Sequence, residues 1–172
     1  RERKIIAGHD ISAGGMITTL LEMCFANRDG GLAVSLTEMD ETDTVKILFS
    51  QNPGVIIQVS DESETEEFLL EHGIRFYNIG HPVKERKIFL TNGSSQFVID
   101  IDHYRSLWYR SSYLLDRRQS SEKLAKERFD NHGSKALEFR LNDFNGTFSA
   151  LHITPERKAN TGVRAAIIRE KG

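Results

Sequence analysis

The segment "AGHDISAGGMITTLLEMCFAN", residues 7–27, constrains the fold most, because a polar turn with two glycines leads directly into a helical pattern. Four apolar residues in it follow the i, i+3, i+4, i+7 spacing of one buried helix face: Ile17, Leu20, Leu21 and Cys24. We therefore predict a helix over residues 12–27 that packs this stripe against a core.

The turn before this helix has two interpretations that the residues leave open. A helix N-terminus presents unpaired N–H groups and about half a positive charge, so Gly14 and Gly15 could let the backbone approach a phosphate group. His9, Asp10 and Ser12 would then surround the anion. Alternatively, Asp10 or Ser12 caps the helix and the glycines permit tight packing, which residue chemistry favours. A metal site is the weakest interpretation, because one His beside one Asp does not make a ligand set.

Hydrophobic periodicity and turn residues predict alternating helices and strands over residues 5–101. "VIIQVS" (55–60) is apolar on both faces, which indicates a central strand. Ser63 and Glu66 have capping-box spacing at the start of a helix that ends before Gly73. The remaining predicted elements are strands over 31–37 and 74–80, a helix over 43–50, and a hairpin over 87–101 that turns near Asn92-Gly93. Together they predict an α+β fold with a mixed sheet flanked by helices.

The strongest helical pattern covers residues 102–118. One face of it carries Tyr104, Leu107, Trp108, Ser111, Leu114, Leu115 and Arg118. Such a stripe indicates either core packing or a contact with a neighbouring domain. The sequence that follows is polar and weakly helical, residues 154–162 have linker composition, and "VRAAIIREKG" (163–172) is typical of a strand.

Composition excludes several classes of protein. The 172 residues are 38% hydrophobic and 28% charged, which fits a globular domain with a core. A formal net charge of −2 argues against a nucleic-acid partner. No apolar run approaches the roughly 20 residues that span a bilayer, so we expect no membrane partner. The single cysteine, Cys24, excludes an internal disulfide and fits the cytoplasm.

Few side chains outside the turn are typical of catalysis. Cys24 lies on the buried stripe and is predicted to be a core thiol, whereas Glu22 lies off that stripe and faces solvent or an interface. His72 precedes Gly73 and can stabilise the C-terminus of a helix. No phosphate-binding loop of the Walker type, no Ser/His/Asp arrangement and no zinc spacing is present in the sequence. The residues therefore predict at most part of an active site.

Three segments resemble one family. "HDISAGGMITTLLEMCFA" (9–26) resembles the start of the C-terminal domain of the AIR synthetase (PurM-like) superfamily, whose pattern is H-D-x-S-D-G-G followed by a helix with L-x-E-M-A. "YRSLWYRSSYLLDRRQSSEKLAKERFD" (104–130) is similar to the helical connector of the long-form phosphoribosylformylglycinamidine synthases. "VRAAIIREKG" is similar to the first strand of the glutamine amidotransferase domain in that family.

The resemblance implies a fragment of a multidomain ligase. Residues 1–101 would be an AIR synthetase-like C-terminal domain with partial ferredoxin-like similarity, residues 102–162 a helical connector and linker, and residues 163–172 the first strand of a truncated amidotransferase. The parent enzyme would use ATP, Mg²⁺ and glutamine to convert formylglycinamide ribonucleotide to formylglycinamidine ribonucleotide in purine biosynthesis. We expect the isolated fragment to be inactive and to bind neither cofactor stably.

The resemblance implies that the partners are small-molecule substrates, the N-terminal PurM-like halves and the amidotransferase domain. We also expect non-native self-association through a face that truncation exposes. Positions that match the motif are possible nucleotide-facing residues: His9, Asp10, Ser12, Gly14 and Gly15. Ala13 stands where the family has Asp, which weakens a magnesium or nucleotide role for this turn. No catalytic residue and no metal ligand is predicted. The alternatives are a scaffold domain whose Trp108 helix binds a partner, and the C-terminal half of another PurM-like ATP-using enzyme.

Overall fold

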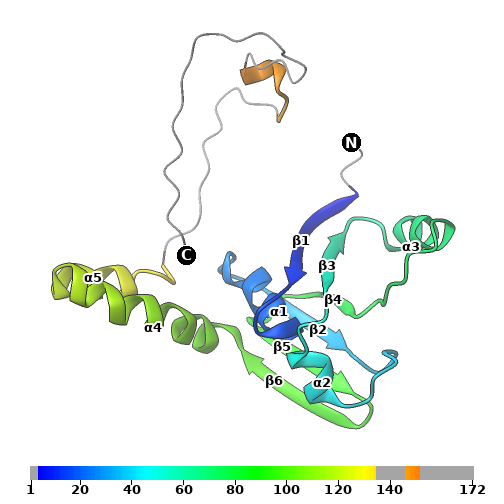
Figure 1. Cartoon of the computed structure of the whole chain (residues 1–172), viewed down its shortest axis with the longest axis horizontal. Helices are drawn as coiled ribbons and strands as arrows, with labels where there is room; N and C mark the ends of the chain where they lie inside the picture. The colour runs from blue at the N-terminus through cyan, green and yellow to red at the C-terminus, as the bar shows by residue number, and fades with distance from the viewer. Residues whose placement is uncertain (1–3, 135–145, 152–172) are drawn as a thin grey trace. The chain divides into compact units, whose positions relative to one another are not determined.

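The computed structural model describes residues 4–134 and 146–151 (Figure 1). The chain divides into two units, Arg1–Leu137 and Glu138–Gly172. In the second unit the described residues form one short 3-10 helix, η1 (Ser149–Leu151). The predicted linker over 154–162 and the predicted strand over 163–172 lie outside the described residues.

A mixed four-stranded sheet forms the base of the first unit, with strand order β4-β2-β5-β6. Its strands are β2 (Gly31–Ser35), β4 (Gly80–Val83), β5 (Lys87–Asn92) and β6 (Ser95–Asp100). The β2 and β5 strands are parallel, and the other two pairs are antiparallel. The hairpin of β5 and β6 turns at Gly93, whose φ of 57° is in the left-handed region, so that prediction is confirmed.

A second sheet contains two antiparallel strands, β1 (Ile5–Ile11) and β3 (Gly54–Val59). The expectation that residues 55–60 form a central strand was wrong. This strand pairs with β1 alone among the described strands, and Val55 is exposed. Strand β1, which contains His9 and Asp10 of the motif, was not predicted from the sequence. A continuous apolar run is therefore not sufficient evidence of a central position.

Three helices accompany the sheets: α1 (Gly15–Phe25), α2 (Thr44–Phe49) and α3 (Glu62–Glu71). The predicted capping box of α3 was wrong, because Asp61 is the N-cap and its carboxylate accepts from the Glu64 backbone N–H at 2.9 Å. The predicted end of α3 is confirmed, since Gly73 follows it with a φ of 63°. The predicted role of His72 is also confirmed, because its Nδ1 lies 2.8 Å from the Phe68 carbonyl oxygen.

The segment 74–80 was predicted as a strand, but β4 begins only at Gly80. Side-chain bonds hold the preceding residues against α3 instead, with Asn78 Nδ2 donating to Glu62 and Glu66. Gly80 has a φ of 140°, and a Cβ there would lie 1.9 Å from the carbonyl oxygen of Ala33. The strand therefore starts where glycine allows the backbone to approach β2.

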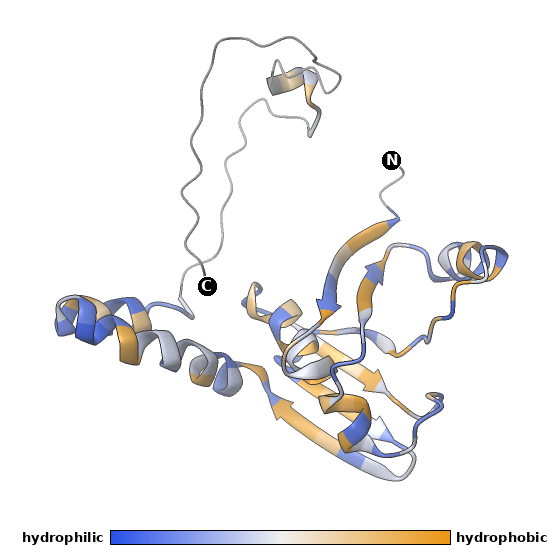
Figure 2. Cartoon of the chain, in the orientation of Figure 1, coloured by the Kyte–Doolittle hydropathy of each residue, from blue (hydrophilic) through white to orange (hydrophobic). Residues whose placement is uncertain are grey.

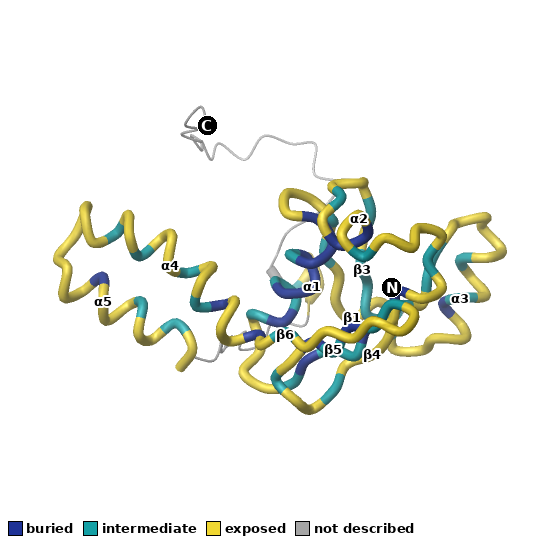
Figure 3. Tube along the Cα trace, turned by 90° about the horizontal axis from the view of Figure 1, so that it is seen from below, coloured by how far each residue is buried: buried dark blue, intermediate teal, exposed yellow. Residues whose placement is uncertain are grey.

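The hydrophobic core lies between α1, α2 and the four-stranded sheet, as the buried positions in Figure 3 and the apolar strands in Figure 2 show. Every predicted stripe residue of α1 is buried in it. The other buried members of this core are Met16, Val34, Leu36, Ile47, Leu48, Ile88, Leu90 and Ile101. Helices over a mixed sheet confirm the predicted α+β class.

A helical hairpin follows β6 and consists of α4 (Ile101–Gln119) and α5 (Glu122–Asp130). Tyr113 and Phe129 stack across it with ring centroids 4.8 Å apart, and Arg128 donates two hydrogen bonds to Asp116. The predicted apolar stripe of α4 does not enter the core, because Trp108, Leu114 and the rest of it are exposed. In the described part of the chain, no helix is long and apolar enough to cross a membrane.

Candidate functional site

The motif turn connects β1 to α1 through two consecutive glycines in the left-handed region. Gly14 has a φ of 90° and is the N-cap of α1, and Gly15 has a φ of 73°. The prediction that Asp10 or Ser12 caps this helix was wrong, since the N-cap makes no side-chain hydrogen bond in the described structure. Asp10 belongs to β1, and Ser12 contributes its carbonyl oxygen, which accepts from the Gly15 N–H at 3.0 Å.

Gly15 is required by close packing of the turn against the end of α2. A Cβ at this position would lie 2.6 Å from the carbonyl oxygen of Leu48 and 2.8 Å from the backbone of Phe49. The buried hydroxyl of Thr19 donates to the Asp10 carbonyl oxygen at 3.0 Å. The turn therefore joins β1, α1 and α2, which agrees with the tight-packing half of the second interpretation.

A line of polar contacts connects this motif to α4. His9 Nε2 lies 3.2 Å from Glu22 Oε2, and Trp108 Nε1 donates to Glu22 Oε1 at 3.1 Å. His9 Nδ1 also lies 2.8 Å from the Asp10 carbonyl oxygen. Both His9 nitrogens thus lie within hydrogen-bond distance of oxygen atoms. Glu22, predicted to face solvent or an interface, bridges β1 and α4.

The accessible part of the turn is small. Ser12, Ala13 and Gly14 are exposed, whereas Gly15, Met16 and Ile17 in the first turn of α1 are buried. An anion would therefore meet the backbone at Ser12–Gly14 and not the deeper donors of the helix. Residues 4–134 and 146–151 contain no group of three or more His, Cys, Asp or Glu side chains that could hold a metal ion. With Ala13 in place of the family's Asp, this turn does not fit Mg²⁺.

Arg86 forms a second junction that the sequence analysis missed. Its Nη1 donates to the carbonyl oxygens of Cys24 at 2.9 Å and Gly30 at 3.3 Å, and its Nε donates to Asp102 Oδ1 at 3.1 Å. One guanidinium thus binds the C-terminal end of α1 and the first turn of α4. Burial raises the pKa of the Cys24 thiol, and the nearby Arg86 charge opposes that rise. Cys24 is therefore the core thiol that the sequence predicted.

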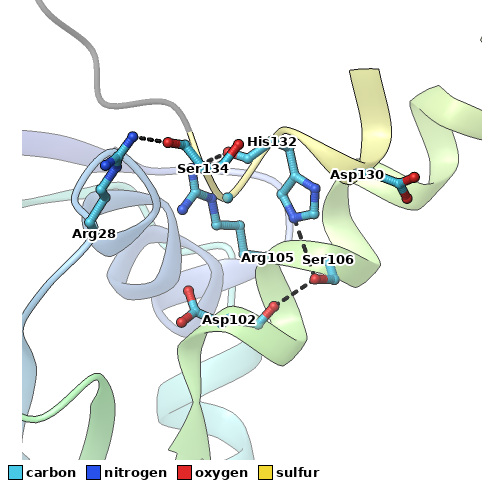
Figure 4. A pocket seen from close by; sticks show the side chains of 8 residues that line it. Arg28, Asp102, Arg105, Ser106, Asp130, His132 and Ser134 are labelled. Atoms are coloured by element: carbon cyan, nitrogen blue, oxygen red, sulfur yellow. Dashed lines mark hydrogen bonds between the residues drawn. The ribbon is translucent and has the colours of Figure 1, made fainter. Parts of the chain in front are cut away.

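A pocket of about 360 Å³ lies between α4, the end of α5 and the loop after α1 (Figure 4). Arg105 is 6% exposed, and its Nη2 donates to the His132 carbonyl oxygen at 2.7 Å, while its Nε has no partner in the described structure. Arg28 donates to the Ser134 carbonyl oxygen. Asp102 and Asp130 also line the pocket, where Asp102 is paired with Arg86 and Asp130 with Lys126.

Comparison with known proteins identifies the family. Residues 1–92 match the family model described as AIR synthase related protein, C-terminal domain. The match includes the motif turn and the elements from β1 to β5. This chain belongs to that family.

Three relatives extend the similarity beyond the family domain. The chain is 27% identical over its full length to phosphoribosylformylglycinamidine synthase of Homo sapiens. It is 30% identical over its full length to the probable phosphoribosylformylglycinamidine synthase of Caenorhabditis elegans. It is 31% identical over 79% of its length to the probable membrane antigen 75 of Saimiriine herpesvirus 2 (strain 11). The chain spans 13%, 13% and 10% of these relatives, respectively.

Proposed function

We propose that this chain is a non-catalytic segment of a phosphoribosylformylglycinamidine synthase. The observation that carries the proposal is the alignment of the whole chain, including α4 and α5, with the human and nematode synthases. Because the family model ends at residue 92, the similarity beyond it favours a synthase over another PurM-like ATP-using enzyme. The parent would be an ATP-dependent ligase with glutamine as nitrogen donor, and we propose a cytoplasmic location for it.

We propose that the chain divides into three parts. Residues 1–101 form the AIR synthetase-like domain, which the family match over residues 1–92 supports. Residues 102–162 form the connector, which the helical hairpin of α4 and α5 supports. Residues 163–172 would be the first strand of the amidotransferase domain, and this part rests on the sequence pattern alone. The remaining domains of the polypeptide are the proposed partners.

We propose a smaller part in nucleotide binding for the motif residues than their match to the family motif suggests. ATP, when bound in the parent, would activate the amide oxygen of the substrate by phosphoryl transfer, and Mg²⁺ would accompany it. His9, Asp10, Ser12, Gly14 and Gly15 remain the proposed nucleotide-facing positions. Of these, Ser12 and Gly14 are exposed. The His9 ring contacts Glu22, and Gly15 packs against the end of α2. Arg86 is the proposed link that holds the connector against α1.

Genetic complementation tests the proposed enzyme. The full open reading frame that contains this segment should restore purine-independent growth to a strain that lacks phosphoribosylformylglycinamidine synthase. The same frame with the catalytic cysteine of its amidotransferase domain replaced serves as the control that separates glutamine-dependent activity from supply of free ammonia. Failure of the full frame to restore growth, despite soluble expression, would contradict the proposed function.

Amide chemical shifts test the proposed role of the turn separately. Inorganic phosphate or ADP is added to the ¹⁵N-labelled chain, and the signals of Ser12 and Gly14 are followed. Saturable shifts confined to this turn would support an anion-facing role. The absence of shifts at millimolar ligand would leave the turn with its packing role alone.

A further inference from the structure

We propose that the exposed face of α4 is a docking surface for an amphipathic protein helix that carries acidic residues beside its apolar stripe. We define the α4 face as Tyr104, Leu107, Trp108, Ser111, Leu114, Leu115 and Arg118. Figure 3 shows α4 as an exposed helix over most of its length. The proposal rests on the geometry of this helix and does not depend on the activity of the parent enzyme.

The α4 face is apolar, and most of it lies on the side of the helix that points away from α5, while Trp108 at one edge contacts Glu22 and Phe25 of α1. Its five large apolar side chains are each between 43% and 57% exposed. The opposite side of α4 is occupied, since Arg105 is buried, Tyr113 stacks on Phe129, and Asp116 binds Arg128. A contiguous apolar stripe on one side of a packed helix is typical of an interaction surface.

Basic residues follow one edge of this stripe. His103, Arg110 and Arg117 recur at intervals of seven, which places them on one line along the helix. Within residues 4–134, Arg110 and Arg117 make no hydrogen bond or ion pair with another side chain, and neither does Arg118. The acidic residues of α4 are already engaged, with Asp102 held by Arg86 and Asp116 by Arg128. The available charge beside the stripe is therefore positive.

The two ends of the α4 face differ, because one is fixed by contacts with α1 and the other lines a surface hollow. Trp108 is fixed near the N-terminal end, because its Nε1 donates to Glu22 and its ring lies 6.0 Å from that of Phe25. Near the C-terminal end, Leu114, Leu115, Arg117 and Arg118 line a surface hollow of about 330 Å³. An apolar hollow with a basic rim suits an apolar side chain that is flanked by carboxylates.

Charge argues against a second copy of this chain as the occupant. In an antiparallel pair of α4 helices, the edge that carries Arg110 and Arg117 would face the same edge of the other copy. Like charges would then lie opposite each other along the contact. A partner helix with Glu or Asp at those edge positions removes this repulsion and adds attraction.

An anionic membrane is disfavoured as the occupant by the rest of the chain. Trp108 is bound to Glu22 on α1, so a carboxylate would accompany this end of the stripe toward the lipid. The chain also has a formal net charge of −2, which opposes binding to an anionic surface. A protein helix can place its carboxylates opposite Arg110 and Arg117 and leave a neutral residue opposite Glu22, which a uniformly anionic surface cannot do.

The experiment uses a synthetic three-heptad helical peptide with a leucine stripe and Glu on both flanks, and a matched peptide with Lys in place of Glu. Neither peptide contains Trp, and Trp108 is the single tryptophan of the chain, so its fluorescence reports binding. The Glu peptide should bind in a saturable manner and more weakly as salt rises. The Lys peptide should bind on the order of tenfold more weakly.

Charge reversal provides the second arm. The double variant Arg110→Glu/Arg117→Glu should exchange the preference, so that the Lys peptide binds more tightly than the Glu peptide. Lys46→Glu/Lys84→Glu changes the net charge equally at exposed residues of other elements and should keep the original preference. Circular dichroism of each variant verifies folding. Equal binding of the two peptides, or no binding of either, would overturn the proposal.

Two further measurements separate the other occupants. Sedimentation equilibrium should show a monomer, and a dimer that Leu114→Ser/Leu115→Ser dissociates would overturn the proposal in favour of a second copy. Vesicles of phosphatidylcholine with phosphatidylserine should leave the Trp108 emission unchanged. A shift with these vesicles that the double arginine variant abolishes would overturn it in favour of a membrane.

Discussion

Replacement of Gly15 by alanine measures how strongly the motif turn is constrained by packing. Gly15 has a φ of 73°, and a Cβ there would lie 2.6 Å from the Leu48 carbonyl oxygen. A left-handed conformation costs a residue with a Cβ roughly 1–2 kcal/mol. Displacing the backbone of α2 adds an overpacking cost of about 1–3 kcal/mol. We expect Gly15→Ala to lower the free energy of unfolding by about 2–5 kcal/mol.

Gly93→Ala is the matched control. Gly93 also has a positive φ, of 57°, but nothing lies within 4 Å of the position that its Cβ would occupy. Both variants pay the left-handed cost, and both gain equally from a less flexible unfolded chain. The difference between them therefore isolates the contact of the turn with α2, and we expect it to be about 1–3 kcal/mol.

Urea unfolding followed by circular dichroism gives both free energies. The slope of free energy against urea concentration should be equal in the two variants, which allows a direct comparison. If Gly15→Ala and Gly93→Ala cost the same within about 0.5 kcal/mol, the turn is not held by α2 and the packing argument is refuted.

Three other perturbations have defined outcomes. Glu22→Ala should change the Trp108 emission maximum because the indole N–H loses its carboxylate acceptor, whereas Glu22→Gln keeps an acceptor and should change the spectrum less; an emission maximum unchanged by Glu22→Ala would contradict the contact. The Cys24 thiol should react slowly with a disulfide reagent in the folded chain and rapidly in urea, since it is buried and its pKa is raised by burial; equal rates would contradict its core position. The hydrogen bonds from Arg128 lower the pKa of Asp116, so this pair stabilises the fold above the ordinary Asp pKa, and the stability is lost as pH falls through the lowered value. Asp116→Asn should therefore lose stability at pH 7 and show a smaller decrease on acidification, and an unchanged pH dependence of unfolding would contradict the pair.

The elements that were predicted correctly are those in which the residues that define the local pattern are also the residues that the fold buries or places in the turn. The α1 stripe is buried as expected, and the hairpin turns at Asn92-Gly93 because glycine adopts the left-handed conformation there. The class of fold followed from the alternation of these elements. In each case the residues that define the pattern also make the contacts that stabilise it.

The missed elements depend on contacts between distant residues. Residues 74–79 have the composition of a strand, but the Asn78 side chain hydrogen-bonds to two glutamates of α3. Strand β4 therefore begins only at Gly80. The strand β1 exists because β3 pairs with it, and no periodicity in residues 5–11 indicated that pairing. The stripe of α4 has a core pattern yet is exposed, because periodicity reports amphipathicity and not the identity of the partner.

The motif turn shows the same limit at the candidate site. The sequence identified its residues but assigned the helix cap to Asp10 or Ser12, because a side-chain cap is the common solution. Gly14 takes that position instead, because β1 continues to Ile11 and the tight turn after it bonds the Gly15 N–H to the Ser12 carbonyl oxygen. Arg86 was missed because its three acceptors lie 16 to 62 residues from it in the sequence.

Product formation by the purified 172-residue chain tests the central claim most directly, namely that this is a segment of a ligase without a reaction centre of its own. The chain is incubated with ATP, Mg²⁺, glutamine and formylglycinamide ribonucleotide, and formylglycinamidine ribonucleotide and glutamate are quantified. We predict rates equal to those of a blank without protein, while the full-length protein forms both products under the same conditions. Turnover above the blank by the chain alone, lost on its heat inactivation, would contradict the account.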